Sequence, residues 1–311
     1  MVSLSKKYFC KVFFIIIFTG IFFSCGEKAP APAGKITVKI NGNVAEFTVE
    51  ATDAQTFEWD FGDDSPVSYE QNPVHTYNEF GRKYMVILKM SGSGGETILT
   101  EAVTVREMTN MEILCGAETD PDGRRWRLSS TANGFRAVPN TSLTVNQTYS
   151  PGVLRDMGFV NAYLDEFVFK SNGDYSIRPN GQGIIAGLTY CTSKNIPNTP
   201  PGQEAISKGL TLINSFTPPQ GLKFALNESK SLSVTVSDGA SSTDVIFPDV
   251  MTLSFSKGGF LGLNNWVTDC IITDLRETSM KVAFFTSNIP AESQNAGKTN
   301  GVLILTFELV E

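Results

Sequence analysis

The chain has 311 residues, which at roughly 150 residues per domain predicts about two domains. Apolar residues make up 41% and charged residues 18%, so the sequence predicts a packed core and excludes a disordered polyelectrolyte. The formal net charge of −7 argues against nucleic acid as a partner, because an acidic surface repels phosphates. The 22 phenylalanines favour strands over helices.

The N-terminus has the organisation of a secretory signal peptide. Three lysines precede an apolar run over residues 12–23, which is about half as long as a membrane-spanning helix. Ser24-Cys25-Gly26 follows the run directly and resembles a bacterial lipobox, although two phenylalanines depart from its usual first residues. The resemblance implies that residues 1–24 are removed and that Cys25 is lipidated and becomes the N-terminus. An uncleaved membrane anchor is the alternative.

Residues 25–34 are predicted to be a short tether, because their prolines and alanines form a semi-rigid segment without side chains for a core. Removing residues 1–24 takes away three lysines and no acidic residue. The mature chain then has 287 residues, with 22 basic against 32 acidic side chains and a net charge of −10. Acyl chains on the cysteine would hold this chain at the outer membrane, since each buried methylene contributes about 0.8 kcal/mol.

Three cysteines, Cys115, Cys191 and Cys270, remain in the mature chain besides Cys25. An odd number permits at most one intramolecular disulfide, and spacings of 76 and 79 residues do not suit a zinc site. The favoured interpretation is three buried, unpaired thiols, with one disulfide as the alternative. A single histidine makes a histidine-rich metal centre impossible, so neither a metal nor another cofactor is expected.

Residues 35–107 are predicted to be a first domain of antiparallel strands. Apolar and polar residues alternate over 36–40 and 45–49, with Asn41-Gly42-Asn43 between them, which predicts a β-hairpin. The same period of two returns over 84–88 near the end of the block. These strands predict a small β-sandwich.

Three spaced motifs in this block resemble those of the PKD domain, an immunoglobulin-like module. The segment from Trp59 reads WDFGDDS, residues 72–77 read NPVHTY, and a glycine and a tyrosine follow before the next strand. Asp64 stands where the family usually has glycine, which a turn tolerates because aspartate adopts left-handed conformations. The resemblance implies that His75 and the aspartates serve the fold. Since His75 is the only histidine, Ser-His-Asp and Cys-His catalysis are then excluded.

Residues 108–311 are predicted to form one larger β domain. Short alternating segments recur along it with turn residues between them, which predicts a β-sandwich or jelly roll and makes the whole chain all-β. The one predicted helix covers residues 204–214, where three apolar residues share a face, although Gly209 weakens the pattern. The predicted strands are centred on residues 126–128, 167–169, 175–177, 232–236, 251–255, 280–284 and 305–309.

The acidic residues of this domain do not fall into a known catalytic spacing. The E-x-D-x-x-E run of laminarinase-type glycosidases is missing from the sequence, and so are phosphate-binding loops and a G-x-S-x-G sequence. Asp165 and Glu166 are adjacent, so in a strand they face opposite sides and cannot serve one bond. An enzyme is therefore not expected. A carboxylate pair assembled from distant strands remains the alternative.

Three stretches, residues 122–128, 164–175 and 253–262, together resemble the C-terminal domain of PKD-bearing lipoproteins from Bacteroidetes glycan-utilisation loci. Many members of that group are surface glycan-binding proteins. The resemblance implies a cell-surface lipoprotein that captures polysaccharide for uptake, with an outer-membrane glycan import complex as a partner. The chain lacks the tryptophan pair often found near position 150 in that group.

Aromatic side chains are the candidate contacts for such a ligand, because flat rings stack on the apolar faces of pyranose rings while polar side chains bind the hydroxyls. Trp266 ranks first because it lies in a Gly-rich segment with two asparagines beside it. Packing in the core is the alternative for each aromatic residue. The candidate glycan-binding residues are Trp266, Asn264, Asn265, Trp126, Arg124 and Tyr163.

The predicted function is that of an outer-membrane, surface-exposed lipoprotein that binds a neutral β-glucan, with the PKD domain as a spacer. The net charge of −10 disfavours polyanionic glycans, although Arg124, Arg125 and Arg127 form a local basic patch. Two alternatives remain. One is a glycoside hydrolase or lyase with a dispersed carboxylate site, and the other is a structural or adhesive surface protein.

Overall fold

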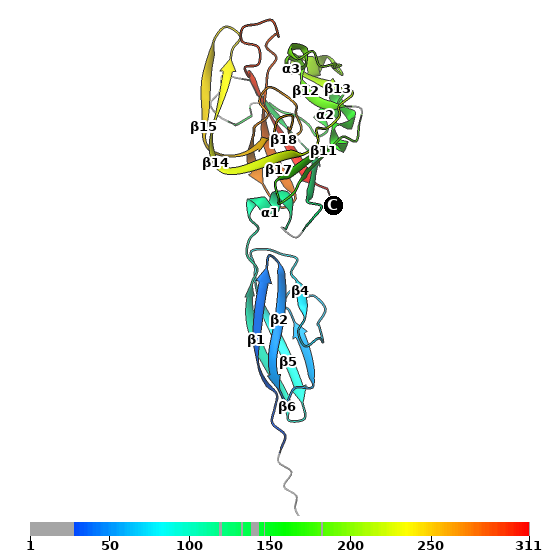
Figure 1. Ribbon diagram of the computed structural model, residues 1–311, viewed down its shortest axis with the longest axis vertical. Coiled ribbons are helices and arrows are strands. Elements are labelled where there is room, and N and C mark those ends of the chain that lie inside the picture. Colours follow the sequence, from blue (N-terminus) through cyan, green and yellow to red (C-terminus); the bar gives the residue numbers. More distant parts are fainter. Residues whose placement is uncertain are drawn as a thin grey trace, which may run out of the picture. The chain divides into compact units, whose positions relative to one another are not determined.

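The chain divides into two compact units (Figure 1). The division lies between Val105 and Arg106, two residues before the predicted boundary. The predicted signal peptide and Cys25 lie outside the described residues. The computed structural model describes residues 28–117, 120–131, 133–137, 143–145, 147–181 and 183–310.

The N-terminal unit is a sandwich of two three-stranded antiparallel sheets (Figure 1). One sheet contains β1 (Ala33–Asn41), β2 (Val44–Thr52) and β4 (Val74–Thr76), and the other contains β3 (Thr56–Asp60), β5 (Lys83–Gly92) and β6 (Gly95–Thr104). The predicted hairpin is confirmed, because β1 and β2 pair in antiparallel register around Gly42, which has a φ of 62°. A positive φ favours glycine at this turn.

The alternating apolar residues of these strands meet between the two sheets. Trp59 is completely buried, and its Nε1 donates a hydrogen bond of 2.9 Å to the carbonyl oxygen of Glu70. The Phe47 ring lies 5.3 Å from the rings of both Trp59 and Phe61. Buried aromatic rings of this size dominate the energetics of a small core. The aromatic residues of the WDFGDDS motif therefore hold the sandwich together.

The polar residues of the motifs also serve the fold. His75 stacks on Phe61 at 4.0 Å, and its Nε2 lies 2.8 Å from a carboxylate oxygen of Asp63. Although burial by itself raises the pKa of Asp63, the hydrogen bonds from Ser65 and His75 hold it below its usual value. Asp64 has a φ of 61°, which confirms the left-handed turn position predicted for it. The interpretation of His75 as a fold residue agrees with these contacts.

The segment before β1 is packed against the sandwich, which corrects part of the predicted tether. The hydroxyl of Thr97 donates a hydrogen bond of 2.6 Å to the carbonyl oxygen of Pro32. A Cβ at Gly94 would overlap the carbonyl oxygen of Pro30, so the turn between β5 and β6 needs glycine there. Since β1 begins at Ala33, the described part of residues 25–34 belongs to the folded unit.

The C-terminal unit is built on one large antiparallel sheet (Figure 1). Its described strands are β7 (Arg124–Leu128), β8 (Gly134–Ala137), β9 (Gln147–Thr148), β10 (Glu166–Phe169), β11 (Asp174–Arg178), β14 (Leu222–Ser237), β15 (Ser242–Phe255), β16 (Cys270–Leu275), β17 (Ser279–Thr286) and β18 (Gly301–Leu309). Pairing runs from β17 through β16, β15, β14, β11, β10 and β7 to β18, which pairs back to β17. The described strands confirm the predicted all-β class and each predicted strand, and they pair as one closed sheet.

Both faces of the sheet carry apolar clusters along β17. Phe284 belongs to the larger cluster and lies 6.2 Å from the ring of Phe307. The next residue, Phe285, belongs to a second cluster and lies 5.5 Å from Phe247 of β15. Successive side chains of a strand point to opposite faces, so β17 is covered on both sides. The outer part of the β14–β15 hairpin covers the second face.

Short elements precede the sheet or lie between its strands. A helix, α1 (Asn110–Cys115), begins at a capping box formed by Thr109 and Glu112. A separate antiparallel pair of strands is flanked in the chain by two helices. Its backbone bonds to the 256–269 segment, and Thr189 of one helix bonds to Ser287. These further elements are α2 (Val153–Asp156), the 3-10 helix η1 (Val160–Leu164), β12 (Ile184–Gly187), α3 (Leu188–Ser193), α4 (Gln203–Ser207) and β13 (Leu210–Ile213).

The predicted helix over residues 204–214 is wrong in its second half. Helix α4 ends at Ser207, and Gly209 follows with a φ of 70°, which ends helical geometry. Leu210 and Ile213 then lie on β13, where they are buried. The spacing of these apolar residues fitted a helix, but the left-handed glycine separates a short helix from a short strand.

Cys115, Cys191 and Cys270 are buried and unpaired, which confirms the favoured interpretation. Burial raises the pKa of the Cys115 thiol to about 12 and that of Cys191 to about 11, and it raises the pKa of Cys270 as well. In the part of the chain that the structure describes, no helix is long and apolar enough to cross a membrane.

Candidate functional site

The three tryptophans have different surroundings. Trp59 and Trp126 are 0% exposed, whereas Trp266 is only partly buried. Trp126 lies on β7 inside the large apolar cluster, and its Nε1 donates a hydrogen bond of 2.9 Å to the carbonyl oxygen of Leu114. A ring without exposed surface cannot stack on a sugar. The prediction of Trp126 as a glycan contact is therefore wrong, and its alternation with Leu128 reflects core packing.

Trp266 lies in a small group of side chains that we call the Trp266 cluster, consisting of Tyr190, Lys194, Trp266 and Gly297. The Tyr190 ring meets the indole edge-on at 5.4 Å and 82°. The Lys194 ammonium lies over the indole at 5.3 Å from its centroid. A Cβ on Gly297 would lie 3.2 Å from the indole, so backbone covers part of one face. Trp266 is thus a partly exposed residue whose ring has a cation beside it and whose Nε1 is buried without a hydrogen-bond partner among the described residues.

The two asparagines predicted beside Trp266 have structural roles. Asn264 pairs through its backbone with β12, with N–H···O distances of 3.0 Å to Ile185 and 2.9 Å from Gly187. Asn265 is 2% exposed; its amide donates to the Phe285 carbonyl at 3.0 Å and accepts from the Trp266 backbone N–H at 2.8 Å. The prediction of Asn265 as a ligand contact is wrong. Its buried side chain instead fixes the backbone that carries Trp266.

Arg124 lies elsewhere, in a polar groove of about 570 Å³. Its guanidinium donates hydrogen bonds to the carbonyl oxygens of Ile113 at 2.9 Å and Glu277 at 3.1 Å. Arg124 therefore ties α1 and the β16–β17 turn to β7. The residues that line this groove are Asp120, Asp122, Gly123, Arg124, Arg125, Arg178, Leu309 and Val310.

The basic residues of this groove have acidic partners. Glu166 lies 3.4 Å from Arg125 and 3.9 Å from Arg178. Arg127, further along β7, lies 2.8 Å from Glu308. The predicted basic patch is thus interleaved with carboxylates, and exposed pairs of this kind contribute little energy.

Tyr163, the last predicted candidate, is partly buried on η1. Its hydroxyl accepts a hydrogen bond of 3.1 Å from the backbone N–H of Leu154, and the Arg155 guanidinium lies 5.9 Å from its ring. The hydroxyl therefore holds η1 against α2. The six candidates do not form one site, because Arg124 and Trp126 belong to β7 and Trp266 to the 256–269 segment.

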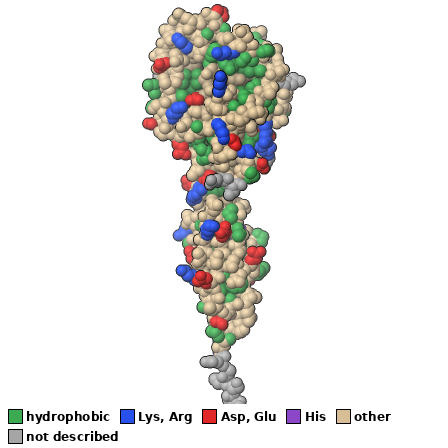
Figure 2. Space-filling model, viewed as in Figure 1, with side chains coloured by type: hydrophobic (Ala, Val, Ile, Leu, Met, Phe, Trp, Pro, Cys, Tyr) green, Lys and Arg blue, Asp and Glu red, His purple; other side chains and the backbone are tan. Residues whose placement is uncertain are grey.

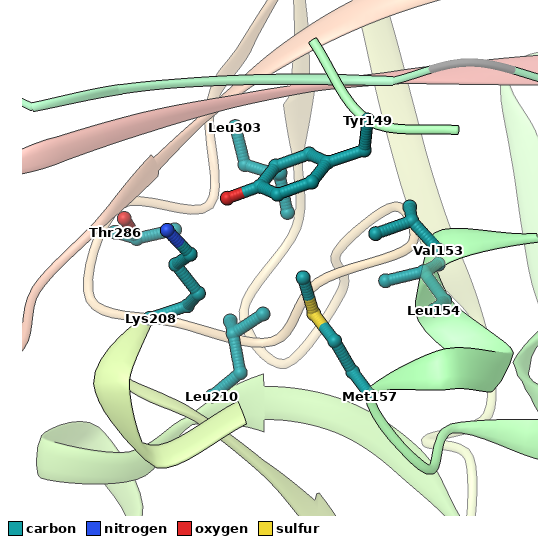
Figure 3. Close-up of a pocket in the computed structure, with 8 residues that line it drawn as sticks. All are labelled: Tyr149, Val153, Leu154, Met157, Lys208, Leu210, Thr286 and Leu303. Atoms are coloured by element: carbon teal, nitrogen blue, oxygen red, sulfur yellow. The ribbon is translucent and has the colours of Figure 1, made fainter. Parts of the chain in front are cut away.

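A second aromatic–lysine pair lies at a pocket that the sequence did not indicate (Figure 3). The Lys208 ammonium lies 5.4 Å from the Tyr149 ring centroid. The Lys208 ammonium and the Tyr149 hydroxyl both donate hydrogen bonds to the side-chain oxygen of Gln147, at 3.2 Å and 3.1 Å respectively. Tyr149 and Lys208 are too far apart in sequence for a spacing signal. The pocket is lined by Tyr149, Val153, Leu154, Met157, Lys208, Leu210, Thr286 and Leu303.

The adjacent carboxylates Asp165 and Glu166 are separated by the strand, as predicted. Glu166 faces Arg125 and Arg178, whereas Asp165 is 3% exposed and accepts a hydrogen bond of 2.9 Å from the backbone N–H of Asn180. Burial raises the pKa of Asp165 to about 7. Asp165 lines neither the Arg124 groove nor the Tyr149 pocket, so its raised pKa is a property of the core.

The N-terminal unit, an immunoglobulin-like β-sandwich with the WDFGDDS and NPVHTY motifs at its core, belongs to a known class of module. Residues 28–106 match the family model described as the PKD domain, as the motifs predicted. Similar solved structures include the PKD1 domain of Vibrio anguillarum Epp, which is 24% identical in sequence. The match covers 25% of this chain and 98% of that chain, with a TM-score of 0.24. The PKD1 domain of the Vibrio cholerae metalloprotease PrtV matches with 22% identity, coverage of 25% and 100%, and a TM-score of 0.23.

Proposed function

We propose that the chain is a surface-anchored lipoprotein that binds a polysaccharide without cleaving it, through the Trp266 cluster of its C-terminal unit. The observation that carries the proposal is the partly exposed indole of Trp266 on a backbone fixed by the buried Asn265. A flat ring held in place binds the apolar face of a pyranose at little entropic cost. The PKD domain acts as a spacer, and PKD domains occur in surface and adhesive proteins.

The surroundings of the indole suit a carbohydrate. Tyr190 and Lys194 supply a hydroxyl and an ammonium beside the ring, and such groups bind sugar hydroxyls while the ring excludes water. Both residues come from α3 and its C-terminal end, which packs beside the 256–269 segment through backbone bonds of Gly187 and Asn264. The aromatic ring and its polar neighbours therefore share one rigid support.

The membrane anchor is the second part of the proposal. The lipobox-like Ser24-Cys25-Gly26 sequence supports acylation of Cys25 and residence at the outer membrane, with a glycan import complex as the partner that receives the polysaccharide. Mass spectrometry of the membrane fraction is expected to show a diacylated or triacylated peptide beginning at Cys25. A mature chain that still contains residues 1–24 would contradict the anchor and leave the binding site untouched.

The binding site is tested with the chain from Gly26 onward, which keeps both units. Affinity electrophoresis across a panel of polysaccharides is expected to find a retarding polymer, and Trp266→Ala is expected to weaken binding by roughly 1–3 kcal/mol, as loss of an aromatic anchor does. Because the ring is partly buried, Trp266→Leu is the second variant: it keeps apolar packing and removes the flat ring. Tyr69→Ala is the matched control, since Tyr69 is a 70% exposed ring on the PKD domain.

Two outcomes would contradict this function. Equal retardation of the native chain and both folded Trp266 variants would place the site elsewhere. Release of new reducing ends from the retarding polysaccharide would show that the protein is an enzyme.

A further inference from the structure

We propose, on the basis of the function above, that the bound polysaccharide carries carboxylates and that the two aromatic–lysine pairs, Lys194–Trp266 and Lys208–Tyr149, each bind one uronate residue. This differs from the neutral β-glucan predicted from the net charge of the chain. A uronate presents an apolar ring face to an aromatic side chain and a carboxylate to a neighbouring ammonium. Each pair supplies an aromatic ring for the apolar face and an ammonium for the carboxylate.

The two pairs are built alike. The Lys194 ammonium lies 5.3 Å from the Trp266 centroid and the Lys208 ammonium 5.4 Å from the Tyr149 centroid. Lys194 is the C-cap residue of α3 and Lys208 the C-cap residue of α4, and the backbone N–H of each bonds to a carbonyl of its helix. The helix ends thus fix the base of each lysine, while its long side chain can turn from the ring toward a bound carboxylate.

One segment, residues 286–299, contacts both pairs. Thr286 lines the pocket of Tyr149, and its carbonyl oxygen accepts a bond of 2.6 Å from the hydroxyl of Thr299. Two residues before Thr299, Gly297 covers part of the Trp266 ring. The hydroxyl of Thr189 in α3, the helix that ends at Lys194, donates a hydrogen bond of 3.0 Å to the Ser287 carbonyl oxygen. This segment therefore connects the two pairs, and a single polymer is expected to contact both.

The pocket at Tyr149 is small and mostly apolar, with polar groups at one end. Figure 3 shows the Tyr149 hydroxyl, the Lys208 ammonium and the Thr286 hydroxyl at one end, and the apolar side chains of Leu154 and Met157 at the other. Its free volume is about 10 Å³, which admits one water-sized group. A sugar ring is therefore too large to enter, and it is expected to contact the partly exposed Tyr149 and Lys208 from outside the pocket.

The segments that carry Lys194, Trp266 and Lys208, together with the neighbouring 287–300 segment, differ in net charge from the whole chain. Residues 183–216, 256–269 and 287–300 contain four lysines against three acidic residues, a net charge of +1, whereas the whole chain has −7. One of the three acidic residues, Asp269, is paired with Lys230 at 3.2 Å. Figure 2 shows lysine and arginine side chains scattered among apolar ones on the visible face of the C-terminal unit. The acidic residues elsewhere do not prevent an anion from binding here.

The proposal is tested with the chain from Gly26 onward and matched polymers. The probes are polygalacturonate, polyglucuronate, polymannuronate and polyguluronate, each beside the same polymer with its carboxylates reduced to alcohols, and a neutral β-glucan. At least one polyuronate is expected to bind at least tenfold more tightly than its reduced form and than the β-glucan, and its binding is expected to weaken as salt is added.

Charge-removing variants assign the effect to the two pairs. Lys194→Gln and Lys208→Gln are each expected to weaken polyuronate binding roughly tenfold, the loss of one charge-assisted hydrogen bond, and to weaken binding of the reduced polymer by a clearly smaller factor, since glutamine can still donate a hydrogen bond to a hydroxyl. Lys257→Gln is the matched control, because Lys257 is exposed on the 256–269 segment and belongs to neither pair. Loss in the control as large as in the two variants would overturn the proposal.

Three other results would also overturn it. Tighter binding of the β-glucan than of every polyuronate, with loss in Trp266→Leu, would refute the acidic ligand and leave the proposed function standing. Equal binding of a polyuronate and its reduced form would do the same. Retardation by none of the probes, neutral or acidic, would contradict the proposed function together with this inference.

Discussion

Replacing Asp165 with asparagine is expected to stabilise the C-terminal unit at neutral and alkaline pH. Asp165 is 3% exposed, and its carboxylate accepts a hydrogen bond from the backbone N–H of Asn180. Burial raises its pKa from 3.8 to about 7, because the charged form loses its hydration. The amide oxygen of an asparagine can accept the same hydrogen bond without a charge.

The size and sign of the effect follow from proton linkage. The difference between 3.8 and about 7, at 1.36 kcal/mol for each pH unit, corresponds to about 4 kcal/mol. Between pH 4 and pH 7 the folded chain holds a proton on Asp165 that the unfolded chain has released, so the free energy of unfolding falls as the pH rises through this range. Below pH 4 the carboxyl is neutral in both states, and the native chain and Asp165→Asn are expected to have similar stability.

Calorimetric unfolding at a series of pH values from 4 to 8 measures this effect. Asp165→Asn is expected to raise the melting temperature of the C-terminal unit by on the order of 10 °C at pH 8, with the gain disappearing toward pH 4. Asp122→Asn is the matched control, since Asp122 is exposed. Two results would refute the raised pKa of Asp165. One is a gain in melting temperature for Asp165→Asn that is the same at every pH. The other is a native chain that becomes more stable than Asp165→Asn as the pH rises.

Three further expectations concern the packing of the chain. Gly94→Val is expected to displace the segment at Pro30 and to speed proteolytic cleavage there, because its side chain would overlap the Pro30 carbonyl; an unchanged cleavage rate would contradict that contact. Trp126→Phe is expected to lower the free energy of unfolding by about 1–3 kcal/mol through loss of the bond to Leu114, and a change in polysaccharide affinity at unchanged stability would show that the ring is not core. The three buried cysteines are expected to react with iodoacetamide only after denaturation, and a mass gain of the folded chain would show otherwise.

The strands were predictable because apolar and polar residues alternate within each of them, and this alternation is visible in a short stretch of sequence. Residues 126–128 and 305–309 alternate in the sequence and lie on β7 and β18 of the sheet. The helix at 204–214 was mispredicted because Leu210 and Ile213 fit a helical spacing as well as a strand. The φ of Gly209 decided between them, and a backbone angle of this kind depends on the contacts of Gly209 with Ser287 and Asn288, far along the chain.

The candidate site was predictable only in part. A tryptophan in a Gly-rich segment pointed to Trp266, but the same reasoning could not tell a buried amide such as Asn265 from an exposed one. Burial of Asn265 depends on the distant Phe285 carbonyl of β17. The pair of Tyr149 and Lys208 had no sequence signal, because folding alone brings the two residues together.

Acrylamide quenching of tryptophan fluorescence tests the contact between Trp266 and the polysaccharide most directly. Since Trp59 and Trp126 are completely buried, collisional quenching reports on Trp266. A polysaccharide that retards the chain in affinity gels is expected to lower the quenching of the native protein toward the value for Trp266→Leu, and to leave the quenching of that variant unchanged. Undiminished quenching at a saturating concentration of that polysaccharide would show that the ligand binds away from Trp266, in contradiction of the proposed site.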